Sequence, residues 1–120
     1  MKKLIAVLLT MALSLTFFTG CSKKIPVIGI SQYGEHASLD NCREGFLQGL
    51  KDAGLTEGKD FTVNYQNAGF DDAIATQIAQ NFSSNNVALM CGIATPSATA
   101  CYAAAEDKNC LLYTSDAADE

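Results

Sequence analysis

Three consecutive residues, Thr95, Pro96 and Ser97, are the best placed in the chain to bind a ligand. They follow an apolar run over residues 87–94, which is typical of a parallel strand covered on both faces, and they precede an alanine-rich segment. Thr95 suits a helix N-cap and Pro96 the first helical position. A helix that starts at the carboxyl end of a buried strand points its first N–H groups into the crevice where α/β sheets bind ligands. The sequence therefore predicts a cradle for a small anion or carboxylate, with hydroxyls from Thr95 and Ser97. The alternative is a plain helix start without a ligand.

A second polar turn follows an earlier apolar run over residues 25–30, and it begins with Ser31 and Gln32. In a doubly wound sheet the first and third strands flank the point where the strand order reverses. We therefore expect Ser31 and Gln32 to face residues 95–97 across the crevice. Two polar turns at one predicted ligand position favour binding over a plain helix start.

No arrangement of side chains in the sequence suggests catalysis. His36 is the only histidine, and a single histidine before a helix is more often a surface or capping residue. Asp71 and Asp72 fall in the first turn of a predicted helix, where acidic side chains interact favourably with the helix dipole. We read them as helix starters rather than as an acid and base pair.

The composition narrows the classes of partner and cofactor. The chain has 8 basic and 13 acidic side chains, a net charge of −5 at pH 7 and no tryptophan. No basic patch is present, so nucleic acid is not an expected partner. Cys42, Cys91 and Cys101 show no Cys-x-x-Cys spacing, and we expect buried thiols rather than a zinc or redox site. No metal or other cofactor is expected.

The elements that must position these residues alternate along the chain. Apolar residues recur at helical spacing between 39 and 53 and between 74 and 82, and residues 61–65 alternate as a less buried strand does. Gly45 and Gly49 are expected to let the first helix lie close to the sheet. The order strand, helix, strand, helix, strand, helix predicts an α/β fold, a three-layer Rossmann-like (flavodoxin-like) parallel sheet with helices on both faces.

The two ends of the chain differ in sequence pattern from the segment between them. Residues 1–20 have two lysines and an apolar stretch, which indicates an export signal. The ending before Cys21 resembles a bacterial lipoprotein signal, in which this cysteine is lipidated, and residues 21–24 then form the start of a tether. Ordinary signal cleavage is the alternative. Residues 110–120 resemble the in-frame translation of a sequencing-library adaptor, and a genuine strand with an acidic tail is the alternative.

Residues 28–107 resemble the substrate-binding lipoproteins of ABC transporters of the tryptophan/tyrosine-uptake type. The segments that carry the resemblance are Ile30-Ser31-Gln32, Glu35-His36, Glu57-Gly58, Tyr65-Gln66-Asn67-Ala68 and Ala94-Thr95-Pro96-Ser97. The family has a type I periplasmic-binding-protein fold, in which two lobes close on a ligand. Residues 25–109 would then be part of the first lobe, with the second lobe absent.

The resemblance also implies roles for individual residues. It puts Ser31 and Gln32 at the mouth of the first strand, and Thr95 and Ser97 where a ligand carboxylate meets the helix start. The resemblance further implies that Glu35 and His36 lie near the cleft rim and that Gln66 and Asn67 lie to the side of the site. The family often has proline where this chain has Ala37.

The function that follows is that of an exported, lipid-anchored solute-binding protein, which would deliver an aromatic amino acid or similar solute to an ABC permease and ATPase. Because one wall of the site is missing, we expect the chain alone to bind weakly or not at all. A membrane-anchored ligand sensor with the same lobe is the alternative. A flavodoxin-like enzyme is disfavoured, because the turn after the first strand lacks the Gly-x-Gly-x-x-Gly pattern.

Overall fold

A computed structural model describes residues 23–106 and 108–115 of the chain. The predicted signal peptide, Cys21 and the last five adaptor-like residues lie outside this part. Within it, none of the helices combines the length and the apolar character that a membrane crossing requires.

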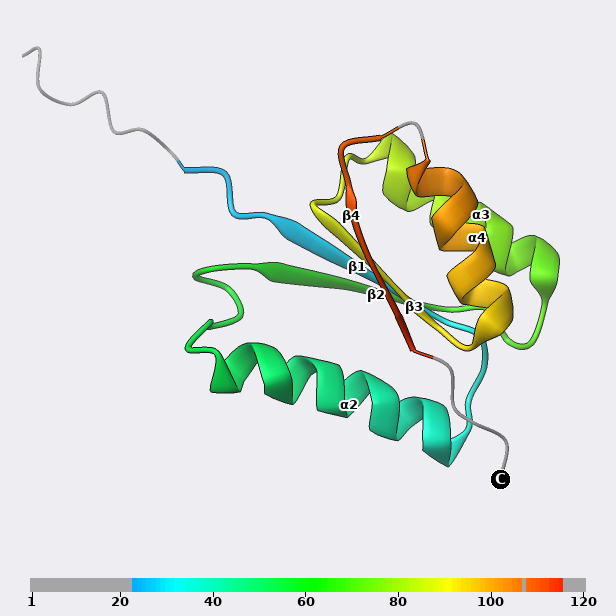
Figure 1. Cartoon of the computed structure of the whole chain (residues 1–120), viewed down its shortest axis with the longest axis horizontal. Helices are drawn as coiled ribbons and strands as arrows, with labels where there is room; N and C mark the ends of the chain where they lie inside the picture. Colours follow the sequence, from blue (N-terminus) through cyan, green and yellow to red (C-terminus); the bar gives the residue numbers. More distant parts are fainter. Residues whose placement is uncertain (1–22, 107, 116–120) are drawn as a thin grey trace, which may run out of the picture.

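Strands and helices alternate along the described chain. They are β1 (Val27–Gln32), α2 (Ala37–Asp52), β2 (Thr62–Asn67), α3 (Asp72–Ser84), β3 (Leu89–Ile93), α4 (Thr95–Ala105) and β4 (Leu111–Ser115). The strands form one parallel sheet in the order β2-β1-β3-β4. Helices α3 and α4 cover one face and α2 covers the other (Figure 1). The predicted three-layer α/β fold is confirmed, and β1 and β3 are neighbours as expected.

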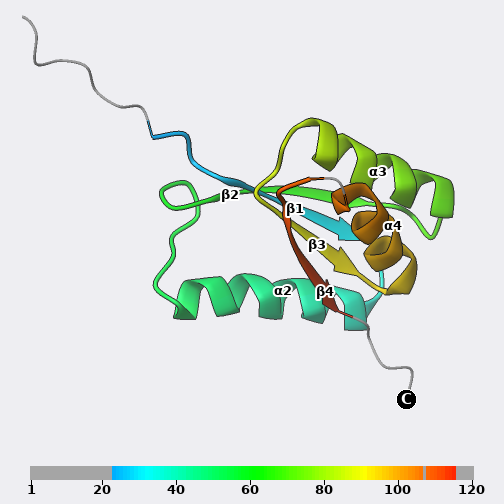
Figure 2. The ribbon, with the colours of Figure 1, turned by 45° about the horizontal axis from the view of Figure 1, so that its top comes forward.

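The two central strands are mostly apolar because both of their faces are covered, and Ser31 and Gln32 at the end of β1 are the polar exceptions. Toward α2, Ile30, Cys91 and Ile93 pack with Leu39. Toward α3 and α4, Met90 packs in a second cluster with helix side chains such as Phe82. The turned view separates these layers, with the sheet between α2 and the other two helices (Figure 2). Coverage of both faces explains the continuous apolar run that marked β3 in the sequence.

Strand β4 pairs in parallel with β3, from Leu89 opposite Leu111 to Ile93 opposite Ser115. The ring of Tyr113 lies 5.1 Å from that of Phe46 on α2. Residues with this β-propensity can pair with a free sheet edge whatever their origin. The resemblance of residues 110–120 to an adaptor therefore stays a prediction.

The helix starts differ in part from those expected. His36 caps α2, since its Nδ1 accepts a hydrogen bond from the backbone N of Ser38 (3.3 Å). Asp71 caps α3 in the same way through the backbone N of Ile74 (3.0 Å), as predicted. The prediction that Thr95 caps α4 is wrong. Ala94 holds that position with a positive φ of 74°, so the chain turns one residue earlier and Thr95 is the first helical residue.

Close contacts between sheet and helices come from strand glycines rather than helix glycines. A Cβ at Gly92 would lie 2.6 Å from the Cα of Ala98, and one at Gly29 would lie 2.6 Å from the ring of Phe82. The expectation for Gly45 and Gly49 is wrong, because both are exposed and a Cβ there would meet nothing within 4 Å. The small residues that matter for packing are therefore on β1 and β3.

Candidate functional site

The carboxyl ends of β1 and β3 bring Ser31 and Ser97 together. Ser31 lies beside Gly92 in the register of the two strands. Helix α4 starts at Thr95, two residues after the end of β3 at Ile93. The Ser31 hydroxyl donates a hydrogen bond to the Ser97 hydroxyl over 3.3 Å, and both side chains are fully buried. The expectation that the first polar turn meets residues 95–97 is confirmed for Ser31. Strand β1 extends through Ser31 and Gln32, which are therefore strand residues rather than loop residues.

The first turn of α4 has the geometry of an anion site. Its first backbone hydrogen bond runs from the N of Ala98 to the O of Ala94 (2.9 Å). The N–H of Ser97 precedes this bond and so has no acceptor inside the helix. No side chain caps the start of α4, and Thr95 is exposed there. This end of the helix carries the positive end of its dipole, which favours a carboxylate.

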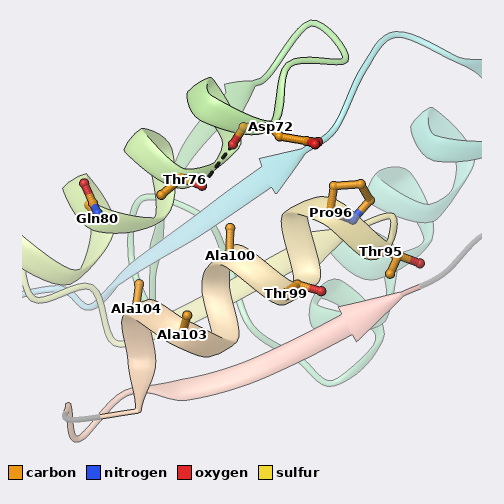
Figure 3. Close-up of a pocket in the computed structure, with 9 residues that line it drawn as sticks. All are labelled: Asp72, Thr76, Gln80, Thr95, Pro96, Thr99, Ala100, Ala103 and Ala104. Atoms are coloured by element: carbon orange, nitrogen blue, oxygen red, sulfur yellow. Dashed lines mark hydrogen bonds between the residues drawn. The ribbon is translucent and has the colours of Figure 1, made fainter.

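A groove of about 650 Å³ runs between α3 and α4, and one end of it reaches this edge of the sheet. Asp72, at the start of α3, lines that end together with Thr95 and Pro96 (Figure 3). The rest of the groove is lined by small or polar side chains farther along the two helices, including Gln80 and Ala104. We call the end formed by Asp72, Thr95 and Pro96 the carboxyl-edge site. It combines an acidic side chain, which can bind an ammonium group, with a helix N-terminus, which can bind a carboxylate group.

Tyr33 connects Asp72 to the turn before it. The Tyr33 hydroxyl donates to Asp72 Oδ1 (2.8 Å) and also lies 3.2 Å from the backbone O of Phe70. The hydrogen bond to Asp72 raises the pKa of Tyr33 above its usual value, and the charges of Asp72 and Asp71 act in the same direction. The Tyr33 ring meets the Phe70 ring edge to face, with centroids 5.6 Å apart. The turns that follow β1 and β2 are therefore joined by side chains as well as by backbone bonds.

Gln32 lies on the opposite face of the sheet from Ser97, because successive strand residues alternate in direction. Its Nε2 donates to the backbone O of Gly34 (2.7 Å) and to Asp40 Oδ1 (2.9 Å), and its Oε1 accepts from Arg43 (2.8 Å). The side chain is fully buried. The expectation that Gln32 also faces residues 95–97 is wrong for its side chain, which instead fixes α2 to the turn after β1.

Asp40 and Arg43 were not among the predicted site residues. Arg43 Nη1 lies 3.1 Å from Asp40 Oδ1, and the guanidinium lies 4.7 Å from the centre of the Tyr65 ring. A signal for this cluster exists in the sequence. Asp40 and Arg43 are three residues apart, and each directly follows a residue of the apolar face of α2, Leu39 or Cys42. Charges at such positions border the buried face and can reach a polar group inside the sheet.

The remaining predicted site residues lie in two places. Glu35 and His36 are exposed in the turn between β1 and α2. Gln66 Nε2 donates to Asn64 Oδ1 on the same strand (3.0 Å). Asn67 Nδ2 donates to the Tyr65 hydroxyl (3.2 Å), and its Oδ1 accepts from the N of Gly69 (2.8 Å). These contacts hold Asn67 in the turn before α3, whereas Ser31, Thr95 and Ser97 gather at the start of α4.

Two thiols are buried in the core, as expected. Desolvation raises the pKa of Cys91 to about 12 and that of Cys101 to about 11. Cys42 is only half-buried, and all three are free cysteines. Among residues 23–106 and 108–115, no group of three or more His, Cys, Asp or Glu side chains is arranged to hold a metal ion.

Comparison with known proteins gives consistent matches. Residues 27–116 match the family model described as ABC transporter substrate binding protein. The chain is 35% identical, over 122 aligned residues, to the tyrosine-binding protein of Clostridioides difficile (strain R20291). That alignment covers 88% of this chain and 35% of the relative, so the chain spans about a third of the curated relative's length.

Solved structures of similar proteins share the fold. A ligand-free, open substrate-binding protein with adhesive properties from Clostridium difficile is 36% identical, with a TM-score of 0.69, over 77% of this chain and 32% of its own. A conserved domain protein from Vibrio cholerae is 43% identical, with a TM-score of 0.64, over 68% and 27%. A Streptococcus pneumoniae ABC domain in complex with L-Trp is 26% identical, with a TM-score of 0.68, over 77% and 31%.

Proposed function

The chain belongs to the ABC transporter substrate-binding protein family, and from this premise we propose that it forms part of the first lobe of a solute receptor for an ABC importer. Members of this family bind solutes and are not enzymes. The complete receptor would deliver its solute to a permease and ATPase. The described residues would supply one wall of the binding cleft, at the carboxyl edge of the sheet.

The observation that carries the proposal is that Asp72 and the first two residues of α4 line the same end of the groove. An amino acid carries an ammonium and a carboxylate group on the same carbon atom. The carboxylate would meet the first turn of α4 at Thr95 and Pro96, at the positive end of the helix dipole. The ammonium would meet the Asp72 carboxylate. The site therefore suits an amino acid better than a simple anion.

We further propose that the solute is an aromatic amino acid. Support comes from the relatives, one of which is described as a tyrosine-binding protein and another of which was solved with L-Trp. Two further predicted site residues, Glu35 and His36, are exposed on the turn that follows β1. They would contact the solute or the second lobe.

Residues 1–20 would direct export, and lipidation of Cys21 would fasten the protein to the outer side of the bacterial membrane. Metabolic labelling with a radioactive fatty acid tests this proposal. The chain should incorporate the label, and Cys21→Ser should not. Incorporation by the serine variant, or none by the original chain, would contradict a lipid anchor at Cys21.

A membrane-anchored sensor that uses the same lobe is the alternative. Its parent gene would continue into a transmembrane or signalling domain. A transport receptor would instead continue into a second lobe, beside genes for a permease and an ATPase. The sequence beyond Asn109 in the parent gene distinguishes the two.

Isothermal titration tests the binding site itself. The parent protein, with both lobes, should bind L-tyrosine or L-tryptophan, while this chain alone should show no submillimolar binding because one wall of the cleft is missing. Tyramine, which lacks the carboxylate, should bind the parent at least about tenfold more weakly than L-tyrosine. Asp72→Asn should weaken the binding of L-tyrosine but not that of its deaminated analogue, and the control Glu44→Gln, at an exposed position on α2 outside the groove, should change neither. Equal binding of tyramine and L-tyrosine would refute the carboxylate cradle.

A further inference from the structure

The turn between β2 and α3 contains a strained aromatic residue, Phe70. Its φ is 64°, in the left-handed region that bulky side chains rarely adopt, and the residue is 56% exposed. Because more than half of the residue's surface stays exposed, burial in the core does not account for an apolar residue here. Backbone strain of this kind concentrates at ligand clamps and active sites. Phe70 therefore calls for an explanation beyond core packing.

The turn holds the Phe70 ring in one place. The ring lies over Gly34, where an added Cβ would overlap it. Tyr33 packs against it edge to face, at an interplanar angle of 89°. The backbone N of Phe70 donates to the O of Tyr33 (2.7 Å), so the backbone is fixed as well. One side of the ring thus packs against the turn after β1, and the rest of the ring is available for contact with a ligand.

Phe70 is linked to Asp72 of the carboxyl-edge site along the chain and through Tyr33. It precedes Asp72 by two residues, and the Tyr33 hydroxyl bonds to Asp72 and reaches the backbone O of Phe70. Asp72 in turn shares the end of the groove with Thr95 and Pro96. A zwitterion held between Asp72 and the start of α4 would have its side chain within reach of this aromatic turn.

We propose that Phe70 is a specificity residue that contacts the aromatic side chain of the bound amino acid. The inference rests on the proposed function, since it requires that the receptor bind an amino acid at the carboxyl-edge site. Ring pairs favour edge-to-face or offset contact, which an aliphatic side chain cannot reproduce. The exposed ring would thereby favour tyrosine and tryptophan over leucine.

Two variants separate this role from local packing. Phe70→Gly removes the ring and also relieves the positive φ, and Phe70→Tyr keeps the ring. Titration of the parent protein with L-tyrosine, L-tryptophan and L-leucine should show about tenfold weaker aromatic binding for Phe70→Gly, with leucine changed less than twofold. Phe70→Tyr should restore the aromatic preference. Urea unfolding of the same variants should show no loss of stability in Phe70→Gly.

The outcomes distinguish the inference from its premise. If the parent binds aromatic amino acids and Phe70→Gly binds them equally well, the role of Phe70 is refuted and the proposed function stands. A parallel loss for all three amino acids, or a marked loss of stability in Phe70→Gly, would make Phe70 a structural residue and also refute the role. If the parent binds none of the amino acids, both the function and the inference fail.

Discussion

The hydroxyl groups of Ser31 and Ser97 lie 3.3 Å apart, although 66 residues separate them in the chain. Both side chains are fully buried between β1 and α4. The bond links β1, one of the two central strands, to the first turn of α4. The same turn would receive a ligand carboxylate. The position of that helix start is therefore set partly by a polar contact inside the core.

Removal of the Ser31 hydroxyl should leave the Ser97 hydroxyl without its hydrogen-bond partner. We expect Ser31→Ala to lower the free energy of unfolding by about 1–3 kcal/mol, because a buried polar group is then unsatisfied. Ser31→Ala combined with Ser97→Ala should cost less than the sum of the two single changes. Urea unfolding measures each value, and Ser84→Ala, at an exposed position on α3, should change little. Strictly additive losses would show that the two hydroxyls do not interact.

Glycines on the sheet and on α2 should respond in opposite directions to the same change. Gly92→Ala places a Cβ 2.6 Å from the backbone of Ala98 and should cost about 1–3 kcal/mol by forcing α4 away from β3. Gly45→Ala adds a Cβ in open space in mid-helix and should stabilise the chain by about 0.5–1 kcal/mol. Thermal and urea unfolding of both variants provide the comparison. A tolerated Gly92→Ala would contradict the packing of α4 on β3.

Gln32 should be important for stability rather than for direct contact with solute. Gln32→Leu removes one of the two acceptors of Arg43 and the side-chain donor to the backbone O of Gly34, and leaves Asp40 with one donor fewer. We expect a loss of about 1–3 kcal/mol in unfolding free energy. The control, Gln66→Leu on exposed β2, should be close to neutral. If Gln32→Leu instead keeps full stability and abolishes solute binding, the side chain serves the ligand.

The order of the elements was predictable because each depends on a local pattern. The apolar run before Ala94 marks a doubly covered strand, and the helical spacing around Phe46 and Ile78 marks α2 and α3. Parallel pairing then follows from the short connections between alternating strands and helices. These signals also predict that Ser31 lies near residues 95–97.

The details of the site depend on contacts that no local pattern contains. Ser31 and Gln32 extend β1 because partners from α4 and α2 satisfy their side chains, so their polarity misleads a reading based on the strand alone. The positive φ of Phe70 and Ala94 is equally hidden, since neither residue type favours that conformation. Ala94 directly precedes α4, and Phe70 lies two residues before the start of α3, so both are in turns at the carboxyl edge. Local sequence patterns therefore do not predict the backbone conformation at the turns that border the candidate site.

The buried thiols should make the chain less stable in alkali. Burial raises the pKa of Cys91 to about 12 and that of Cys101 to about 11 from an ordinary value of 9.0, so between pH 9 and 11 the folded chain keeps protons that the unfolded chain loses. Stability from these groups is complete below pH 9. It should then fall by up to about 1.4 kcal/mol per pH unit for each thiol. Urea unfolding under reducing conditions, from pH 8 to 11, measures this slope. Cys91→Ala with Cys101→Ala should flatten it, whereas the core truncation Val87→Ala should lower stability equally at every pH. An unchanged slope in the double variant would mean that the two thiols already titrate normally in the folded chain.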